Sequence, residues 1–214
     1  MRIVFMTFMS LDGVTQGPGS PDEDTSDGFE RGGWFVPHLD AGFVATVQGW
    51  VEAADAYLFG RRTYTAFAEA WPNMPDPDDP VAQSLNRSHK YVVSNTLADA
   101  DAVWGPATVV RGDIATTLAE LKRQPGRELQ IHGSTTLGRS LLAAGFVDEL
   151  RLVVAPVVVG DGRRLFERTD HPIGLRLVDV AATAGGLSVQ TYEVEGSAQT
   201  GTYDPEVHTF ADRP

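Results

Sequence analysis

Residues 132–166, HGSTTLGRSLLAAGFVDELRLVVAPVVVGDGRRLF, decide the fold class of the chain. Their first half is a glycine turn followed by a helix pattern over 135–144, which Gly145 closes because glycine favours the position just after a helix. From Asp148 onward the residues are apolar and β-favouring, and the β-rich segments 174–184 and 186–194 follow with no helix between them. Strands joined by such short connections are antiparallel, so strand–helix units give way here to an antiparallel sheet edge.

The chain before this stretch alternates strand patterns with helix patterns. Arg2–Met9 is almost uninterrupted apolar, as is typical of a strand buried on both faces of a sheet. Further strands are expected over 55–59, 90–94, 108–111 and 129–132, helices over 38–53, 64–70 and 114–123, and a short helical turn over 81–86. These strand–helix units, followed by hairpin-like strands, predict an α/β fold with helices flanking a mixed sheet whose C-terminal edge is antiparallel.

The length of 214 residues suits one domain. Residues 196–214 are polar and show no periodicity, so we expect residues 1–195 to form the domain and the rest to form a tail docked on it or on a neighbouring subunit. The apolar strand pattern from Leu150 to Val159 would leave an exposed edge, which native proteins usually cover. We therefore predict a twofold homodimer built on these C-terminal strands.

The charge balance excludes several classes of partner. Lys and Arg number 17 against 29 Asp and Glu, so the net charge of −12 repels nucleic acid and anionic membranes.

Cysteine is absent, which excludes disulfides and Cys-ligated zinc, and the five histidines show no metal-ligand spacing, so we expect no metal. The sequence has no leader pattern and no apolar run long enough to span a membrane, so we expect a cytoplasmic protein.

Three turns at strand ends carry residues suited to binding a nucleotide. They are Gly60-Arg61-Arg62-Thr63, Ser94-Asn95-Thr96 and Gly133-Ser134-Thr135. A glycine turn that opens a helix presents backbone N–H groups to a phosphate, and an arginine there adds charge. Taken alone, each also fits an ordinary connecting turn, with solvated arginines in the first and side chains closing the second. Together they indicate one ligand, since ligands of open α/β sheets lie beyond the carboxyl ends of the strands.

Asp12, in the sequence Ser10-Leu11-Asp12-Gly13 after the first strand, is the candidate catalytic residue. Its carboxylate should face the same crevice, where it would bind an amino or hydroxyl group of the substrate or relay a proton. We expect burial beside a planar ring to raise its pKa. The alternative is a structural role, because Asp-Gly pairs commonly close turns.

The order of these motifs carries a family resemblance. SLDG after the first strand, GRRTY after the second, KYVVSNTL on the third and the stretch 132–166 resemble the dihydrofolate-reductase-like superfamily. Within it, the chain is most similar to the C-terminal reductase domain of RibD, the riboflavin-biosynthesis deaminase/reductase. The resemblance covers residues 1–195 and implies a three-layer dihydrofolate-reductase-like fold with NADPH bound across the strand ends.

Residue by residue, the resemblance implies three groups of cofactor contacts. Gly60, Arg61, Arg62 and Thr63 match the grip on the pyrophosphate and 2′-phosphate, Ser94, Asn95 and Thr96 match the segment that holds the adenosine 2′-phosphate, and Gly133, Ser134, Thr135 and Leu137 match the second cofactor loop. Many relatives have a basic residue in place of Asn95. A preference for NADPH over NADH therefore depends mainly on Arg61.

The substrate side departs from the dihydrofolate reductases. Those enzymes place a carboxylate on the helix before the GR-T motif, a position that falls near Val44 here, where there is no acid. Asp12 is the carboxylate expected to face the substrate instead. Trp34, Phe35 and Phe67 are candidates for stacking on a planar ring, with core packing as the commoner role of such residues.

The resemblance implies an NADPH-dependent oxidoreductase that reduces a small polar heterocycle, on the pattern of 5-amino-6-(5-phosphoribosylamino)uracil in riboflavin biosynthesis. Two alternatives stay open at this point. One is a pteridine or dihydrofolate reductase with a displaced acid. The other is a non-catalytic nucleotide-binding protein that uses the same crevice as a sensor.

Overall fold

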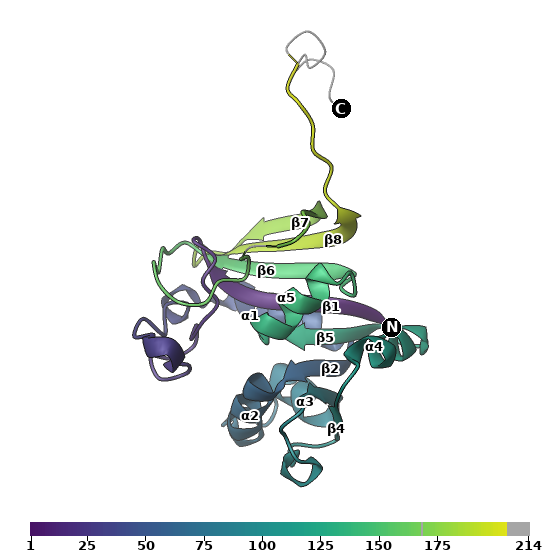
Figure 1. The fold of residues 1–214 in the computed structure, drawn as a ribbon. Coiled ribbons are helices and arrows are strands. Elements are labelled where there is room, and N and C mark those ends of the chain that lie inside the picture. Colours follow the sequence, from purple (N-terminus) through teal and green to yellow (C-terminus); the bar gives the residue numbers. More distant parts are fainter. Residues whose placement is uncertain (168, 205–214) are drawn as a thin grey trace.

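The computed structural model of the protein describes residues 1–167 and 169–204. Eight strands form one sheet in the order β4-β3-β2-β5-β1-β6-β8-β7 (Figure 1). The strands are β1 (Arg2–Ser10), β2 (Ala54–Gly60), β3 (His89–Val93), β4 (Ala107–Val110), β5 (Glu128–His132), β6 (Glu149–Ala155), β7 (Ile173–Ala182) and β8 (Ser188–Ser197). The α-helices are α1 (Ala41–Glu52), α2 (Arg61–Ala70), α3 (Pro80–Arg87), α4 (Ile114–Arg123) and α5 (Thr135–Ala143). Short 3-10 turns cover Ser26–Gly28, Val36–His38, Trp71–Asn73 and Asp99–Asp101.

The strand β1 lies in the interior of the sheet, as its unbroken apolar sequence predicts. It pairs in parallel with β5 on one side and β6 on the other, with Phe5 opposite both Ile131 and Leu150. The strands β2, β3 and β4 continue the parallel half, whereas β8 pairs antiparallel with β6 and β7 pairs antiparallel with β8. The predicted mixed α/β sheet with antiparallel C-terminal strands is confirmed.

Helices cover both faces of the sheet and complete three layers. Alternate residues of a strand point to opposite faces, so neighbours in sequence belong to different cores. In β2, Leu58 belongs to the core under α4 and α5, whereas Tyr57 and Phe59 pack in a core with α2 and α3. The helix α1 contacts α3 on this second face, over a core that includes Val153 of β6. Figure 1 shows α4 and α5 in front of the sheet and α1 behind it.

Two helices differ in extent from the prediction. The helix α2 begins at Arg61 rather than Tyr64, so the GRRT motif itself opens it. Residues 80–87 form a full helix, α3, where a short turn was predicted. The Asp79 carboxylate accepts a hydrogen bond from the N–H of Ala82, and Pro80 occupies the first helical position, which are both helix-starting signals.

The strand β6 is not an edge strand, so the edge predicted over 150–159 was wrong. It lies between β1 and β8, and each of its seven residues is buried. The edge strand on the antiparallel side of the sheet is β7, where Leu177, Val178 and Val180 expose half or more of their surface. The hairpin places its second strand, β8, beside β6. Sequence could not show this, because either strand of a hairpin can pair with the sheet.

The sheet extends slightly beyond the predicted domain. The strand β8 continues to Ser197, two residues past the expected boundary. Residues 198–204 are mostly exposed and run away from the sheet (Figure 1), and the rest of the predicted tail, 205–214, lies outside the described residues. Among the described helices, none is long and apolar enough to cross a membrane.

Candidate cofactor and substrate site

The three predicted nucleotide turns lie at one edge of the sheet. Each follows the carboxyl end of a strand, and β2, β3 and β5 are parallel neighbours. Gly60 of β2 lies opposite Val93 of β3, and on the other side of β2 Tyr57 lies opposite Gln130 of β5. The turns over 60–63, 94–96 and 133–135 are therefore adjacent, as the strand ends predict.

The turns at Gly60 and Gly133 are in direct contact. The backbone N–H of Gly60 donates a hydrogen bond to Ser134 Oγ at 3.1 Å. A Cβ atom on Gly60 would lie 4.0 Å from the Cβ of Leu137, and one on Gly133 would lie 3.7 Å from the Cγ2 of Thr63. Five of the residues predicted to bind the cofactor thus meet at one place.

A left-handed turn brings α5 to this place. Gly133 has a φ of 56° and Ser134 a φ of 46°, a region that glycine adopts freely and other residues rarely do. The N–H of Gly133 donates to the carbonyl oxygen of Met6 in β1 at 3.2 Å. This turn redirects the chain from β5 into α5, whose first N–H groups then lie beside the start of α2.

The helices α2 and α5 both begin without a side-chain cap, in contrast to the other α-helices. Asp40, Asp79 and Asp113 accept hydrogen bonds at the starts of α1, α3 and α4. No side chain does so at α2 or α5. Their first N–H groups keep unused donor capacity, and the helix dipole adds positive partial charge. Two such helix starts in contact are suited to the pyrophosphate of a dinucleotide.

Arg61 adds a free positive charge at this position. It is exposed, and in the described part of the chain its guanidinium has no ion-pair or hydrogen-bond partner. Arg62 acts at longer range on Asp24. Burial alone would raise the pKa of Asp24, but hydrogen bonds from Ser26 and the charges of Arg163 and Arg62 lower it below its usual value.

The side chains of the 94–96 turn already bond within the protein. Ser94 Oγ accepts hydrogen bonds from the N–H groups of Thr96 at 3.1 Å and Leu97 at 2.9 Å. Asn95 Oδ1 accepts from the N–H of Gly112 at 3.1 Å. These are the turn-closing roles that the sequence left as the alternative. A ligand at this turn would meet side chains that are held in place beside Gly60.

Asp12 is the centre of a hydrogen-bonded clamp. Oδ1 accepts from Ser10 Oγ at 2.7 Å and from the N–H of Val159 at 2.9 Å, and Oδ2 accepts from the N–H of Gly160 at 2.9 Å and from Arg164 Nη2 at 3.3 Å. These contacts hold the pKa of Asp12 well below its usual range. The hydrogen bond from Ser10 lowers this pKa most, burial raises it, and the hydrogen bonds from the N–H groups of Val159 and Gly160 lower it further. The predicted rise in this pKa was wrong, because four donors face the carboxylate.

These contacts change what Asp12 can do chemically. A carboxylate that stays ionised at neutral pH has no proton to donate, and its four principal acceptor positions are used by protein donors. The residue instead ties the loop over 156–164 to the turn that follows β1.

The aromatic candidates lie in packed surroundings. Trp34 is buried and its Nε1 donates to the carbonyl oxygen of Gln16 at 2.9 Å. Phe35 is buried and stacks on Phe8, with ring centres 4.7 Å apart and planes 9° from parallel. Phe67 of α2 is partly buried and meets the rings of Phe59 and Trp71 edge-on. Core packing thus occupies these rings in the structure.

A buried polar network, not predicted from the sequence, lies on the α1 face of the sheet. Its members are Glu128, Gln130 and His132 of β5 and Glu149 and Arg151 of β6. The signal was present in ELQIH over 128–132, where polar side chains occupy every second position of a strand. Alternate positions share one face, so three polar groups on an interior strand predict a connected network.

The hydrogen bonds and ion pairs of this polar network run without a break from β6 to the turn at Gly133. Arg151 Nε lies 2.6 Å from Glu149 Oε1, and Arg151 Nη2 lies 2.7 Å from Glu128 Oε1. Gln130 Nε2 lies 2.6 Å from Glu128 Oε2, and Gln130 Oε1 lies 2.7 Å from His132 Nε2. Burial, and secondarily the charge of Arg151, lowers the pKa of His132 to about 3, so the ring is neutral.

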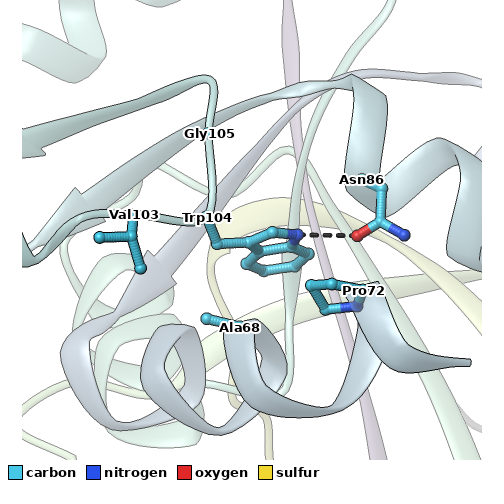
Figure 2. Close-up of a pocket in the computed structure, with 6 residues that line it drawn as sticks. All are labelled: Ala68, Pro72, Asn86, Val103, Trp104 and Gly105. Carbon is cyan, nitrogen blue, oxygen red and sulfur yellow. Dashed lines mark hydrogen bonds between the residues drawn. The ribbon is translucent and has the colours of Figure 1, made fainter.

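A hollow of about 490 Å³ beside Trp104 is separate from the turns (Figure 2). Its lining comes from α2, the 3-10 turn Trp71–Asn73, α3 and the segment before β4, namely Ala68, Pro72, Asn86, Val103, Trp104 and Gly105. Trp104 Nε1 donates to Asn86 Oδ1 at 2.7 Å along one wall (Figure 2). This hollow adjoins the amino end of β4, whereas the candidate cofactor turns follow carboxyl ends. The described residues also contain no group of three or more His, Asp or Glu side chains that could hold a metal ion.

Residues 2–189 match the model of one protein family, the RibD C-terminal domain. The chain belongs to this family. It is 28% identical over 197 residues to the uncharacterized protein YyaP of Bacillus subtilis (strain 168), a match that covers 91% of this chain and 96% of YyaP.

Two solved structures illustrate the likeness. A protein assigned to riboflavin biosynthesis from Shewanella sp. PV-4 superposes with a TM-score of 0.65 at 21% identity, covering 91% of this chain and 99% of the other. Dihydrofolate reductase from Enterococcus faecalis, solved with NADP(H), superposes with a TM-score of 0.55 at 14% identity, covering 91% and 96%. The predicted dihydrofolate-reductase-like fold is confirmed. Membership of the RibD C-terminal domain family supports an oxidoreductase of the reductase kind.

Proposed function

We propose that the protein is an NADPH-dependent reductase of a small polar heterocycle of the ribosylaminopyrimidine class. Family membership supports the reductase part of this proposal. The cofactor part rests on one observation, the contact between the uncapped starts of α2 and α5, where the N–H of Gly60 donates to Ser134 Oγ. The Enterococcus faecalis enzyme that shares the fold was solved with NADP(H), which agrees with a cofactor of this type.

The residues at the turns fit such a cofactor. The first N–H groups of α2 and α5 would hold the pyrophosphate, and small residues at Gly60 and Gly133 let it approach the backbone. Arg61, whose guanidinium is free, would hold the 2′-phosphate that distinguishes NADPH from NADH. Bound there, NADPH would supply a hydride. The Ser94-Asn95-Thr96 turn would border the adenosine side.

In this proposal Asp12 has a structural role and not the catalytic role that the sequence suggests. Its carboxylate holds the loop over 156–164 against the turn after β1 through Val159 and Gly160. We infer that this loop borders the substrate, because it adjoins the carboxyl end of β1. Asp12 would then shape the substrate site through the loop, and the proton needed in reduction would come from another donor or from water.

The decisive experiment is turnover. Purified protein is mixed with NADPH and a ribosylaminopyrimidine, with its phosphorylated form, or with dihydropterin and dihydrofolate for comparison, and NADPH oxidation is followed by absorbance. We expect oxidation with the aminopyrimidine and none with the folate. Oxidation with a pterin alone would favour a pteridine reductase. Tight binding of NADPH with no oxidation across the panel would favour a nucleotide sensor and contradict the proposal.

A further inference from the structure

The buried polar network has a fixed direction of hydrogen-bond donation along its side chains, from Arg151 through Glu128 and Gln130 to His132. Arg151 can only donate, and the Glu128 carboxylate accepts from it. Gln130 Nε2 lies 2.6 Å from Glu128 Oε2 and 2.7 Å from the carbonyl oxygen of Trp50. Both of these oxygens are acceptors, so this end of the amide must be the NH₂ group. Gln130 Oε1 is consequently an acceptor for the next member of the chain.

That acceptor determines the tautomer of His132. Nε2 lies 2.7 Å from Gln130 Oε1, so Nε2 carries the proton. A neutral imidazole has a single N–H, and Nδ1 is then an unprotonated acceptor. The surrounding groups agree with a neutral ring. Arg151 is cationic and is paired with Glu128, and Tyr57, which meets the ring edge-on at 5.0 Å, has its pKa raised to about 12 by burial.

The second ring nitrogen is unused by the protein. In residues 1–167 and 169–204, His132 Nδ1 has no hydrogen-bond partner. Those residues also contain no fully enclosed side-chain nitrogen or oxygen that lacks a partner, so Nδ1 keeps a small exposed surface although His132 as a whole is only 6% exposed. His132 ends β5 and directly precedes Gly133, whose turn contacts Thr63 and lies beside Gly60. The residue that carries this unpaired acceptor therefore adjoins the candidate cofactor turns.

We propose that Arg151, Glu128 and Gln130 hold His132 as the Nε2–H form, so that Nδ1 accepts a hydrogen bond from an N–H, NH₂ or O–H group of the substrate. For the identity of that ligand the inference rests on the proposed function. His132 is then a specificity-determining residue, and Gln130 and Glu128 are positioning residues. A substrate that offers an acceptor at this place is rejected, because the ring has no proton to give it.

The tautomer can be measured without any ligand. Two-bond ¹⁵N–¹H NMR spectra of protein labelled in its histidines distinguish Nε2–H from Nδ1–H, and the signals lost in His132→Gln assign this ring. We expect an Nε2–H pattern that stays unchanged between about pH 8 and pH 5, the range in which an ordinary histidine titrates. An Nδ1–H pattern, or titration near the ordinary value, would overturn the inference.

Gln130→Met tests whether the buried polar network positions the imidazole ring of His132. The variant keeps the approximate volume of the side chain but removes the acceptor that faces Nε2. We expect signals of both tautomers, because nothing then prefers the proton on Nε2. An unchanged Nε2–H pattern would show that Gln130 does not position His132. If the variant fails to fold, the wild-type spectrum still decides the tautomer.

His132→Gln tests the acceptor itself. Its amide NH₂ can still donate to Gln130, but no acceptor remains at the place of Nδ1. With the substrate found by turnover, we expect kcat/KM to fall by about 10- to 100-fold, mainly through KM, because a donor on the substrate is left without a partner. NADPH affinity should stay near wild type. The exposed His171→Gln serves as the control, and equal values for the two variants would contradict the role.

A ligand titration separates this inference from the proposed function. Diaminouracil carries ring N–H and amino donors and requires no turnover. We expect it to shift the Nδ1 resonance of His132, whether or not NADPH is oxidised. Failure of turnover with such a shift would reject only the reductase activity. No shift at saturation would reject the acceptor role for aminopyrimidines.

Discussion

Arg61 is the side chain on which cofactor choice should depend. Its guanidinium is exposed and free at the start of α2. We predict that Arg61→Ala weakens NADPH binding by about 10- to 100-fold and leaves NADH binding nearly unchanged, since a charge-assisted hydrogen bond contributes roughly 1.5–3 kcal/mol. Quenching of tryptophan fluorescence measures both affinities. Arg123→Ala, at the exposed end of α4, is the control, and equal losses for the two nucleotides would contradict a 2′-phosphate contact.

Asp12 should contribute to stability in a pH-dependent way. Its folded-state pKa is lowered, so the stabilisation is present above the ordinary pKa of an aspartate and is lost as the pH falls below it. We predict that Asp12→Asn lowers the free energy of unfolding by about 1–3 kcal/mol at neutral pH, because an amide nitrogen would face backbone donors. The difference from wild type should shrink below about pH 4. Urea unfolding at several pH values measures this difference in the free energy of unfolding. A difference that stays constant with pH would contradict the stabilising role of the ionised Asp12 carboxylate.

At the level of elements, the two glycine turns at the ends of α5 distinguish a role in ligand binding from a role in folding. Gly133 and Gly145 both have positive φ, and only Gly133 lies at the cofactor turns. We predict that Gly133→Ala and Gly145→Ala each cost about 1 kcal/mol of stability, because an L side chain is strained there. Only Gly133→Ala should also weaken NADPH binding. Equal NADPH affinities in the two variants would argue against a ligand at this turn.

Local sequence patterns predicted the elements well, because strand and helix periodicity and glycine turns depend on neighbours in the chain. The strand ends at Gly60 and Gly133 could be placed at one edge for a different reason, because the ligand site of an open α/β sheet lies beyond the carboxyl ends of its strands. The lowered pKa of Asp12 was not predicted, although its largest cause, the hydrogen bond from Ser10, is local in sequence; only the reinforcing N–H groups of Val159 and Gly160 are remote. The interior place of β6 likewise depends on which strand of the later hairpin pairs with it.

At the level of the whole molecule, β7 offers a surface suited to self-association. It is an edge strand with unpaired backbone groups, and Val178 and Val180 are exposed on it. We predict a homodimer formed through this edge, which light scattering would record as twice the 23.1 kDa chain mass. The double change Val178→Lys with Val180→Lys should give the monomer without loss of helix content by circular dichroism. A monomeric wild type at micromolar concentration would contradict the prediction.

Calorimetric titration of the wild-type protein with NADPH and then NADH tests whether the starts of α2 and α5 bind the cofactor. Two uncapped helix starts in contact, with Arg61 beside them, should bind NADPH at one site per chain with micromolar or tighter affinity. NADH should bind at least about tenfold more weakly, which corresponds to about 1.4 kcal/mol. Equal affinities for the two nucleotides, or no binding of NADPH at millimolar concentration, would contradict an NADPH site at these helix starts.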